Sequence, residues 1–416
     1  MTSASTFRTL AVWIGFAVIL AILPMVFSSR PSITLMNLIG SWVVFALAYN
    51  MLLGQAGMLS FGHAVYFGLG GYAAIHMMAA IKSQGLPIPV AALPLVGFMA
   101  GMAAGAVIGW FSCRRSGTAF AMISLGVGEL IAASGLMFVS VFGGEEGISG
   151  DRAAGPDILG FSLGPQLNVY YFIAFWMFVS VLAMWAFTRT PLGRLANAVR
   201  DNPDRVSFIG YDPQRVRYMV FLISGGFAGL AGSLSAVNFE IITPEKLGAI
   251  NSGAVLLMAY IGGIGVFYGP IIGAVLISIM QSMLSDFTKV WQLYLGLMFV
   301  VVVMFAPYGI GGVVHHVLGV VRRGELAEKA PGWLLGLAGA VVAFTGTVLL
   351  VEMAYRVRED GDPVLLFGQE FHHQAASSWI AALVIVAVGL AILVVAVRWR
   401  RRGTLSAALS LKEATP

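Results

Sequence analysis

Residues 88–112 read IPVAALPLVGFMAGMAAGAVIGWFS, a stretch without a single charged side chain. About 20 apolar residues are enough for a helix to cross a lipid bilayer. Within this stretch glycine recurs at every fourth position, at Gly97, Gly101, Gly105 and Gly109. Such a stripe leaves one helix face nearly flat, so that a second helix can pack against it at close range. The stretch therefore predicts a membrane helix in a bundle, and these glycines are assigned to helix packing.

The composition of the whole chain agrees with a membrane protein. Of its 416 residues, 59% are hydrophobic and only 10% are charged, whereas a soluble domain is typically about a quarter charged. One globular core could not bury this much apolar surface, so the solvent must be lipid. The net charge of +5 does not indicate nucleic-acid binding, because the basic residues occupy short loops between apolar runs. We predict an all-α, polytopic transmembrane bundle.

Apolar runs recur along the chain with short breaks. We predict about ten core spans and two further spans, near 9–29, 32–53, 56–81, 88–112, 117–142, 168–188, 217–238, 252–265, 270–285, 291–307, 331–353 and 378–397. The runs 252–265 and 270–285 are either two short spans joined by a tight turn or one long helix with a break. The first run lacks a clear signal-peptide cleavage site, so we interpret it as a retained helix, with cleavage as the alternative.

Two domains are predicted from this pattern. Residues 1–324 form the main transmembrane unit, and residues 325–416 add a C-terminal transmembrane hairpin with a periplasmic loop and a basic cytoplasmic tail. With the N-terminus inside, most basic residues fall in cytoplasmic segments, among them Arg114, Arg115 and Arg194. The positive-inside rule then places both termini in the cytoplasm. The single cysteine, Cys113, excludes an internal disulfide.

Glu129 is the only acidic residue within a predicted core span. A charge in hydrocarbon is costly, so its carboxylate should face the bundle interior or a watery cavity. Two interpretations stay open: a residue of the substrate pathway or gate, and a structural carboxyl bonded near Ser124 and Ser134.

Residues 50–63, NMLLGQAGMLSFGH, are polar and glycine-rich at membrane depth. Unpaired backbone groups are not tolerated in lipid, so this segment should not be a lipid-facing helix throughout. We expect a broken or re-entrant element, whose free helix ends could bind the carboxylate or ammonium of a zwitterion. Its polar side chains, assigned to the substrate pathway together with Glu129, are Asn50, Gln55, Ser60 and His63. For His63 alone, a satisfied core histidine is the alternative.

The segment from Arg189 to Arg217 predicts two short amphipathic helices. Pro191 suits the first turn of one helix, Asn202 and Pro203 can cap and start a second, and Gly210 suits the position just past its end. An apolar stripe on such helices needs a partner, either the lipid headgroups or a groove on another protein. A charge-rich surface loop is the remaining alternative.

The chain lacks the sequence motifs of several activities. There is no G-x-x-x-x-G-K-[ST] phosphate loop, so the chain cannot bind ATP in that way. We find no metal-ligand cluster and no catalytic triad or dyad. A membrane enzyme using Glu129 and His63 would need a second acid or base, and none stands at a convincing spacing.

Five ordered segments resemble the branched-chain amino-acid ABC transporter permease family. The resemblance covers roughly residues 32–310, and its segments are NMLLGQAGMLSFGHA at 50–64 with FGLGGY at 67–72, TAFAMISL at 118–125, TPLGR, AVRDN and GY at 190–194, 198–202 and 210–211, SGGFAGLAG at 224–232, and GGIGVFYGP at 262–270. Pro203 departs from the acidic residue common in the family at that position, and the hairpin at 325–416 lies outside the shared pattern.

The resemblance implies an ATP-driven importer in the bacterial inner membrane. A second homologous permease subunit, two ATP-binding subunits and a periplasmic solute-binding protein are the implied partners, with membrane lipid around them. The loop at 190–211 would couple to the ATPases through Gly193, Arg194, Arg200, Asp201, Asn202 and Gly210. No cofactor is expected in this chain, because ATP would bind to the partner subunits.

The solute stays open at this point. Branched-chain amino acids or related small polar solutes are implied by the resemblance, and urea, amides or sugars are the alternatives within the same superfamily. A proton-coupled secondary transporter with Glu129 as its proton carrier is a further alternative.

Overall fold

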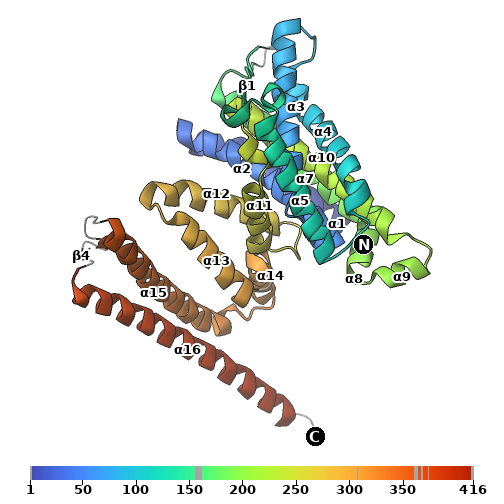
Figure 1. The fold of residues 1–416 in the computed structure, drawn as a ribbon. Coiled ribbons are helices and arrows are strands. Elements are labelled where there is room, and N and C mark those ends of the chain that lie inside the picture. Colours follow the sequence, from blue (N-terminus) through green and yellow to red (C-terminus); the bar gives the residue numbers. More distant parts are fainter. Residues whose placement is uncertain are drawn as a thin grey trace. The chain divides into compact units, whose positions relative to one another are not determined.

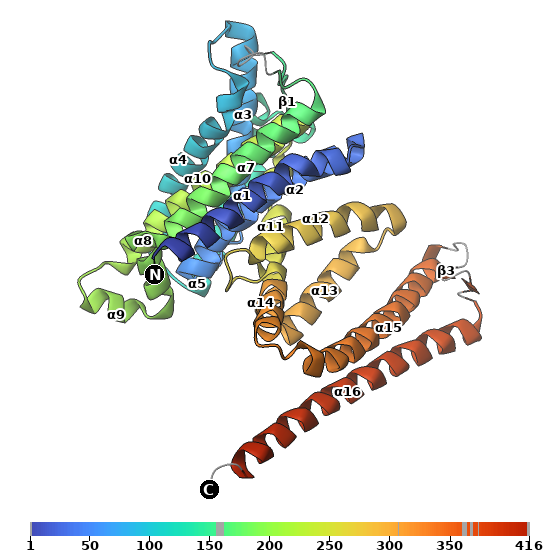
Figure 2. The ribbon, with the colours of Figure 1, turned by 180° about the vertical axis from the view of Figure 1, so that it is seen from behind.

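The computed structural model describes residues 2–154, 162–306, 308–359, 364–366, 369–372 and 374–413 of the chain. The chain divides into two compact units, residues 1–313 and 314–416, and each is described by itself (Figures 1 and 2). The domain boundary predicted after residue 324 stays a prediction.

The first unit is built from helices joined by short connections. Its elements are α1 (Thr2–Val26), α2 (Arg30–Asn50), the π-helical turn η1 (Met51–Gln55), α3 (Ala64–Gln84), η2 (Val90–Ala92), α4 (Leu93–Ser112), α5 (Thr118–Met137), α6 (Val139–Phe142), η3 (Gly144–Glu146), β1 (Ile148–Ser149), α7 (Gln166–Arg189), α8 (Pro191–Asp201), α9 (Pro203–Phe208), α10 (Pro213–Phe239), β2 (Ile241–Ile242), η4 (Pro244–Leu247), α11 (Ala249–Gly262), α12 (Gly269–Phe287) and α13 (Trp291–Phe305). The unit boundary falls within α14 (Gly309–Arg322).

Nine helices among the described residues are long and apolar enough to cross a membrane. Seven belong to the first unit and two to the second, while α13 and α14 pass the same test only as a bent pair. The predicted fold class, an all-α polytopic membrane bundle, is confirmed.

Helix α10 is the centre of the first unit and packs against α2, α3 and α4. Its contact with α4 runs along glycines on both helices. A Cβ on Gly97 would lie 2.6 Å from the Gly229 carbonyl oxygen, and one on Gly101 would lie 2.3 Å from the Gly225 carbonyl oxygen. The predicted glycine stripe thus faces a second glycine stripe, and the two backbones approach each other directly.

The pair α11 and α12 is a hairpin of two short helices. A Cβ on Gly273 would lie 1.8 Å from the Met258 carbonyl oxygen, and one on Gly262 would lie 2.1 Å from the Gly269 carbonyl oxygen. Helices in such contact lie side by side, so the alternative of one long helix with a break is wrong.

Two span predictions need correction, and one helix was not predicted. The span expected from residue 56 begins only at Ala64, because Ala56 ends the preceding helix and residues 57–63 are not helical. The span expected over 117–142 is interrupted at Phe138, whose φ and ψ of −90° and 69° end α5 before the short α6. Helix α14 was not predicted, since Gly309, Gly311 and Gly312 weaken its helical signal.

The two ends of α10 define the two ends of this unit. Strand β2 follows α10 and pairs with β1 in antiparallel register, Ile148 with Ile242 and Ser149 with Ile241. We call this the ribbon end and the opposite end, which carries α8 and α9, the loop end (Figure 1).

The second unit is a helical hairpin. Helices α15 (Leu326–Glu359) and α16 (Ala376–Glu413) pack along their length and are joined by the antiparallel strands β3 (Val364–Leu366) and β4 (Gln369–Phe371). Gly389 lies against the backbone of Ala343, where an added Cβ would be 2.3 Å from the Ala343 nitrogen. This arrangement agrees with the predicted C-terminal hairpin.

Candidate functional site

In the α8–α9 loop, residues 190–211, side chains cap the N-terminus of each helix. The Thr190 hydroxyl accepts a hydrogen bond from the Gly193 N–H at 3.2 Å, and Pro191 occupies the first turn of α8. The Asn202 side chain accepts from the Arg205 N–H at 2.9 Å and starts α9. Both helices therefore begin where Ser/Thr/Asn caps place them.

Helix α8 packs one face against the bundle. Gly193, Ala196 and Val199 are buried, whereas Arg194 is exposed. A Cβ on Gly193 would lie 2.3 Å from the Phe187 carbonyl oxygen, so only glycine fits between α8 and the end of α7.

The tip of α9 presents apolar side chains to the surroundings. Val206 is buried, but Phe208 is 89% exposed, Ile209 64% and Tyr211 52%. Gly210 has φ of +89°, which favours glycine after a helix end. Ile209, an apolar residue just past the end of this helix, belongs to the exposed tip.

Arg200 connects α8 to the end of the α2–η1 helix. Its Nη1 donates a hydrogen bond to the Gly54 carbonyl oxygen, and its Nη2 lies 3.0 Å from the Asp201 carboxylate. Its aliphatic stem covers Gly57, where a Cβ would lie 2.8 Å from the Arg200 Cγ. The polar segment at 50–63 and the α8–α9 loop, separate in the sequence analysis, are therefore in direct contact.

Residues 57–63 form a re-entrant segment. The chain turns at Gly57, whose φ is +68°, and the His63 ring stacks on Phe45 with centroids 5.9 Å apart. Phe45 lies ten residues before Gln55, about 15 Å back along the same helix at 1.5 Å per residue. The chain thus runs back beside the helix it has just left, and α3 begins inside the bundle.

Serine side chains satisfy the backbone of this segment. The Ser124 hydroxyl, from α5, accepts from the Phe61 N–H at 3.0 Å, and the Ser252 hydroxyl, from α11, accepts from the Ala64 N–H at 2.9 Å. The Tyr49 hydroxyl donates to the Ser60 carbonyl oxygen at 2.9 Å. Polar backbone away from water needs such partners, and here they come from the surrounding helices.

His63 has a defined hydrogen-bonding role. The Ser224 hydroxyl donates its one proton to the Ala48 carbonyl oxygen at 2.6 Å. The contact of 3.1 Å between that hydroxyl and His63 Nε2 must therefore have the imidazole as donor. His63 is fully buried and helps to bond α2, α3 and α10 together.

The residues assigned to the substrate pathway lie in two places. Asn50, Gln55, Ser60 and His63 are all buried, with at most 8% of their surface exposed. Glu129 is exposed on α5. Their membership of a pathway stays a prediction.

Glu129 does not face the interior of this chain's own bundle. The Ser124 hydroxyl donates to the Ala121 carbonyl oxygen and the Ser134 hydroxyl to the Leu130 carbonyl oxygen, within the same helix. The expected bond from these serines to Glu129 is absent among the described hydrogen bonds. The cost of a charge in hydrocarbon predicted a polar environment for Glu129, but this argument does not tell which face of α5 meets the rest of the chain.

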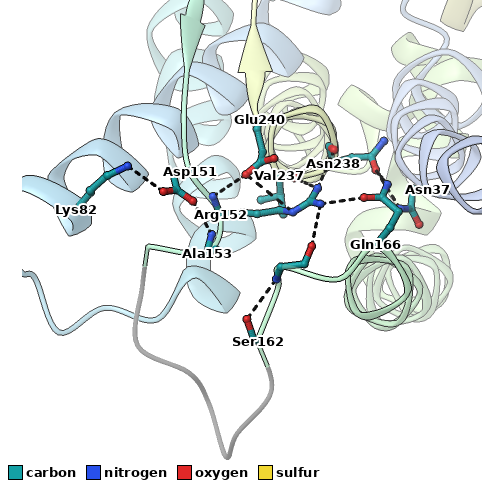
Figure 3. Close-up of polar contacts among 11 residues, drawn as sticks. Asn37, Lys82, Asp151, Arg152, Ala153, Ser162, Gln166, Val237, Asn238 and Glu240 are labelled. Atoms are coloured by element: carbon teal, nitrogen blue, oxygen red, sulfur yellow. Dashed lines mark hydrogen bonds and ion pairs between the residues drawn. The ribbon is translucent and has the colours of Figure 1, made fainter. Parts of the chain in front are cut away.

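Arg152 organises the ribbon end (Figure 3). Its guanidinium donates to the carbonyl oxygens of Asn238 at 3.0 Å and Val237 at 3.3 Å, in the last turn of α10, and to Gln166 Oε1 at 2.9 Å. The Gln166 amide donates in turn to Asn238 Oδ1 at 3.0 Å, as does the Asn37 amide at 3.0 Å. A cation at a helix C-terminus is favourable, and this one also ties α2, α7 and α10 together.

A second contact fixes the same loop to α3. Lys82 Nζ lies 2.9 Å from Asp151 Oδ2, and this hydrogen bond holds the pKa of the Asp151 carboxyl below its ordinary value. The role of Arg152 was not predicted. No local sequence pattern signals this role, because the partners of Arg152 on α10 lie 85 and 86 residues further along the chain.

A polytopic helical bundle with a re-entrant segment and an amphipathic two-helix loop is the class of protein defined by this fold and site. The sequence profile of the family described as branched-chain amino acid transport system / permease component matches residues 32–306, and the chain belongs to that family of transport permeases. The resemblance stated from residues 32–310 is confirmed.

Individual relatives match about two thirds of the chain. The high-affinity branched-chain amino acid transport system permease protein LivM of Escherichia coli (strain K12) is 27% identical over 303 residues, 68% of this chain and 70% of the relative. LivH of the same strain is 25% identical over 284 residues, 65% of this chain and 91% of the relative. A probable LivM of Methanocaldococcus jannaschii is 24% identical over 318 residues, 65% of this chain and 90% of the relative. No solved structure matches the chain.

Proposed function

We propose that the chain is the membrane-spanning permease subunit of an ATP-driven importer that translocates branched-chain amino acids or related small polar solutes. In this proposal it pairs with a second homologous permease, two ATP-binding subunits dock on it, and a periplasmic binding protein delivers the solute. Family membership and the names of the relatives support the solute class. Urea, amides and sugars are the alternative solutes, which competition in an uptake assay would separate.

The exposed tip of the α8–α9 loop is the observation that carries the docking part of the proposal. Phe208 and Ile209 are 89% and 64% exposed at the end of a short polar helix. Leaving such side chains in water forgoes about 1.5–3 kcal/mol for each, so a groove on another protein is a favourable place for them. The ATP-binding subunits would provide that groove and bind the nucleotide, since this chain has no phosphate loop.

The orientation follows from the same assignment. Docking on cytosolic ATPases requires the loop end on the cytoplasmic side of the bacterial inner membrane, and the excess of basic residues there favours it. The ribbon end would then face the periplasmic binding protein. The positive-inside rule supports the proposal that both chain termini are cytoplasmic.

The pathway would run along the exposed face of α5. A carboxylate does not face lipid at membrane depth without a polar partner or water. Glu129 is exposed in the single chain, and a second permease packed on this face would enclose it in a shared, polar space.

The experiment is co-purification of the chain with candidate ATP-binding subunits. The double variant Phe208→Asp with Ile209→Asp should lose the ATPases while it stays inserted in the membrane. The matched control is Ile241→Asp, which changes an apolar residue 44% exposed at the ribbon end and should keep them. Retention of the ATPases by the double variant, or their loss in the control, would refute the docking surface.

A further inference from the structure

We propose that Arg200 is a positioning residue that transmits movement of the α8–α9 loop to the re-entrant segment, residues 57–63. It acts inward, on its own chain, and not as a contact for an ATP-binding partner. This inference rests on the proposed function, because it concerns how a docked motor would move the bundle.

The side chain of Arg200 points to the segment. Its Nη1 donates to the Gly54 carbonyl oxygen, one of the last-turn carbonyl groups that lack a partner within the helix. A guanidinium at this position also interacts favourably with the negative end of the helix dipole. The end of the α2–η1 helix is thus capped by a residue 146 positions further along the chain.

The backbone of the turn is held by the same residue. A Cβ on Gly57 would lie 2.8 Å from Arg200 Cγ, 3.4 Å from its Cβ and 3.6 Å from its Cα. Because Gly57 also has φ of +68°, a side chain there is strained and would collide with Arg200. The first residue of the segment therefore moves with α8.

The other end of the segment is attached to α5. Besides the bond from the Phe61 N–H to Ser124, the backbones themselves touch: a Cβ on Gly62 would lie 2.1 Å from the Ser124 carbonyl oxygen. A Cβ on Gly128 would lie 3.0 Å from Gly62 Cα. A displacement of the segment is therefore passed to the part of α5 next to Glu129.

Close backbone packing of this kind transmits displacement instead of absorbing it, since packed interiors have low compressibility. The structure thus contains a continuous mechanical connection from the α8–α9 loop, through Arg200 and residues 57–63, to α5. Arg200 keeps 40% of its side chain exposed beside Asp201, while its Nη1 makes the inward bond to Gly54.

The test uses the assembled complex with its ATPases and binding protein, reconstituted in vesicles. Arg200→Ala should co-purify with the ATPases and keep basal hydrolysis, but solute transported per ATP should fall at least tenfold. The control is Arg215→Ala, at the start of α10, where the side chain is 86% exposed and ion-paired with Asp212; this variant should keep that ratio. Loss of the ATPases from Arg200→Ala would identify Arg200 as a docking contact and overturn the inference.

Replacing the contact between Gly57 and Arg200 by a disulfide tests whether the contact transmits movement or only helps the protein to fold. In a Cys113→Ser background, Gly57→Cys with Arg200→Cys places two thiols on neighbouring Cβ positions, 3.4 Å from the ideal Cβ of residue 57 to that of residue 200, near the usual disulfide spacing. The reduced protein should be uncoupled, and oxidation of the same preparation should restore transport per ATP at least fivefold.

The other outcomes also test whether Arg200 transmits movement to residues 57–63. Because a side chain at position 57 is strained by its φ of +68°, Gly57→Ala is the folding control. Where that variant inserts and assembles, failure of the two thiols to cross-link would show that the contact does not exist. An oxidised protein that stays uncoupled would show that the contact does not transmit. If the unsubstituted chain assembles with no ATPase at all, the proposed function fails instead, and the two failures are distinguishable.

Discussion

Gly101 and Gly105 belong to the same stripe on α4, yet they should respond oppositely to replacement by alanine. A Cβ on Gly101 would lie 2.3 Å from the Gly225 carbonyl oxygen and 2.9 Å from Gly229 Cα. A Cβ on Gly105 would meet its nearest neighbour, Leu222 Cα, at 3.6 Å, an ordinary van der Waals contact.

The magnitude follows from these distances. Real Cβ atoms essentially never approach another atom closer than 3.0 Å, so α4 must withdraw from α10 by roughly 0.7 Å at Gly101. Overpacking against backbone costs about 1–3 kcal/mol, and a gap of about 0.5–1 Å forfeits a quarter to a half of each nearby dispersion contact. Alanine returns about 0.5–1 kcal/mol of helix preference at either site. We expect Gly101→Ala to destabilise the protein by about 2 kcal/mol and Gly105→Ala to be neutral or slightly stabilising.

The assay is thermal or denaturant unfolding of the two variants in the same detergent. A difference of about 2 kcal/mol corresponds to roughly 30-fold in the folding equilibrium constant, which is readily measured. Equal behaviour of the two variants would refute the close approach of α4 and α10 at Gly101.

Three further outcomes test the remaining contacts. Arg152→Gln should lower the free energy of unfolding by about 2–3 kcal/mol, because it leaves buried acceptors of α10 unpaired. Lys82→Ala should lower it by under about 1 kcal/mol, because it removes only an exposed ion pair. Unfolding in detergent measures the stability of both variants. Ser224→Ala should cost about 1–3 kcal/mol by removing the partner of a buried imidazole, while Ser233→Ala, whose hydroxyl bonds only within its own helix, should cost less; equal losses would contradict the proposed bonding. The lowered pKa of Asp151 means that its stabilising contribution is present above its ordinary pKa and is lost as the pH falls through the lower value in the folded protein. Proteolysis of the ribbon-end loop should therefore increase in strong acid, and Asp151→Asn should be cleaved faster at neutral pH as well; an unchanged rate for that variant would contradict the contact with Lys82.

Periodicity predicted much of the fold, because lipid leaves the chain few alternatives. The four-residue spacing from Gly97 to Gly109 showed that a helix would approach closely. It could not show that this helix is α10, since the choice of partner depends on contacts between distant segments. Polar composition likewise located the break after Asn50, but the helix restarts at Ala64, eight residues later than expected from hydropathy alone.

Only those features of the candidate site that depend on residues close together in the sequence were predictable. Caps such as Asn202 act on their own neighbours and are visible in the sequence. Phe208 was missed because α9, with six residues, is too short to show a periodic face. Glu129 was expected to face the bundle interior or a watery cavity, and it does not face the interior of its own chain. The cost of a buried charge predicts a polar environment but not which chain or cavity provides it.

The serines around the re-entrant segment have a consequence for biogenesis. Ser124, Ser224 and Ser252 are 63, 161 and 188 residues from the groups they bond. A ribosome releases those hydroxyls long after residues 57–63 have left the exit tunnel. During that interval the Phe61 and Ala64 amides and the His63 imidazole lack these partners and require water, a chaperone or the insertion machinery in their place. Insertion of this region should accordingly be completed late, once the segment carrying Ser252 has entered the bilayer.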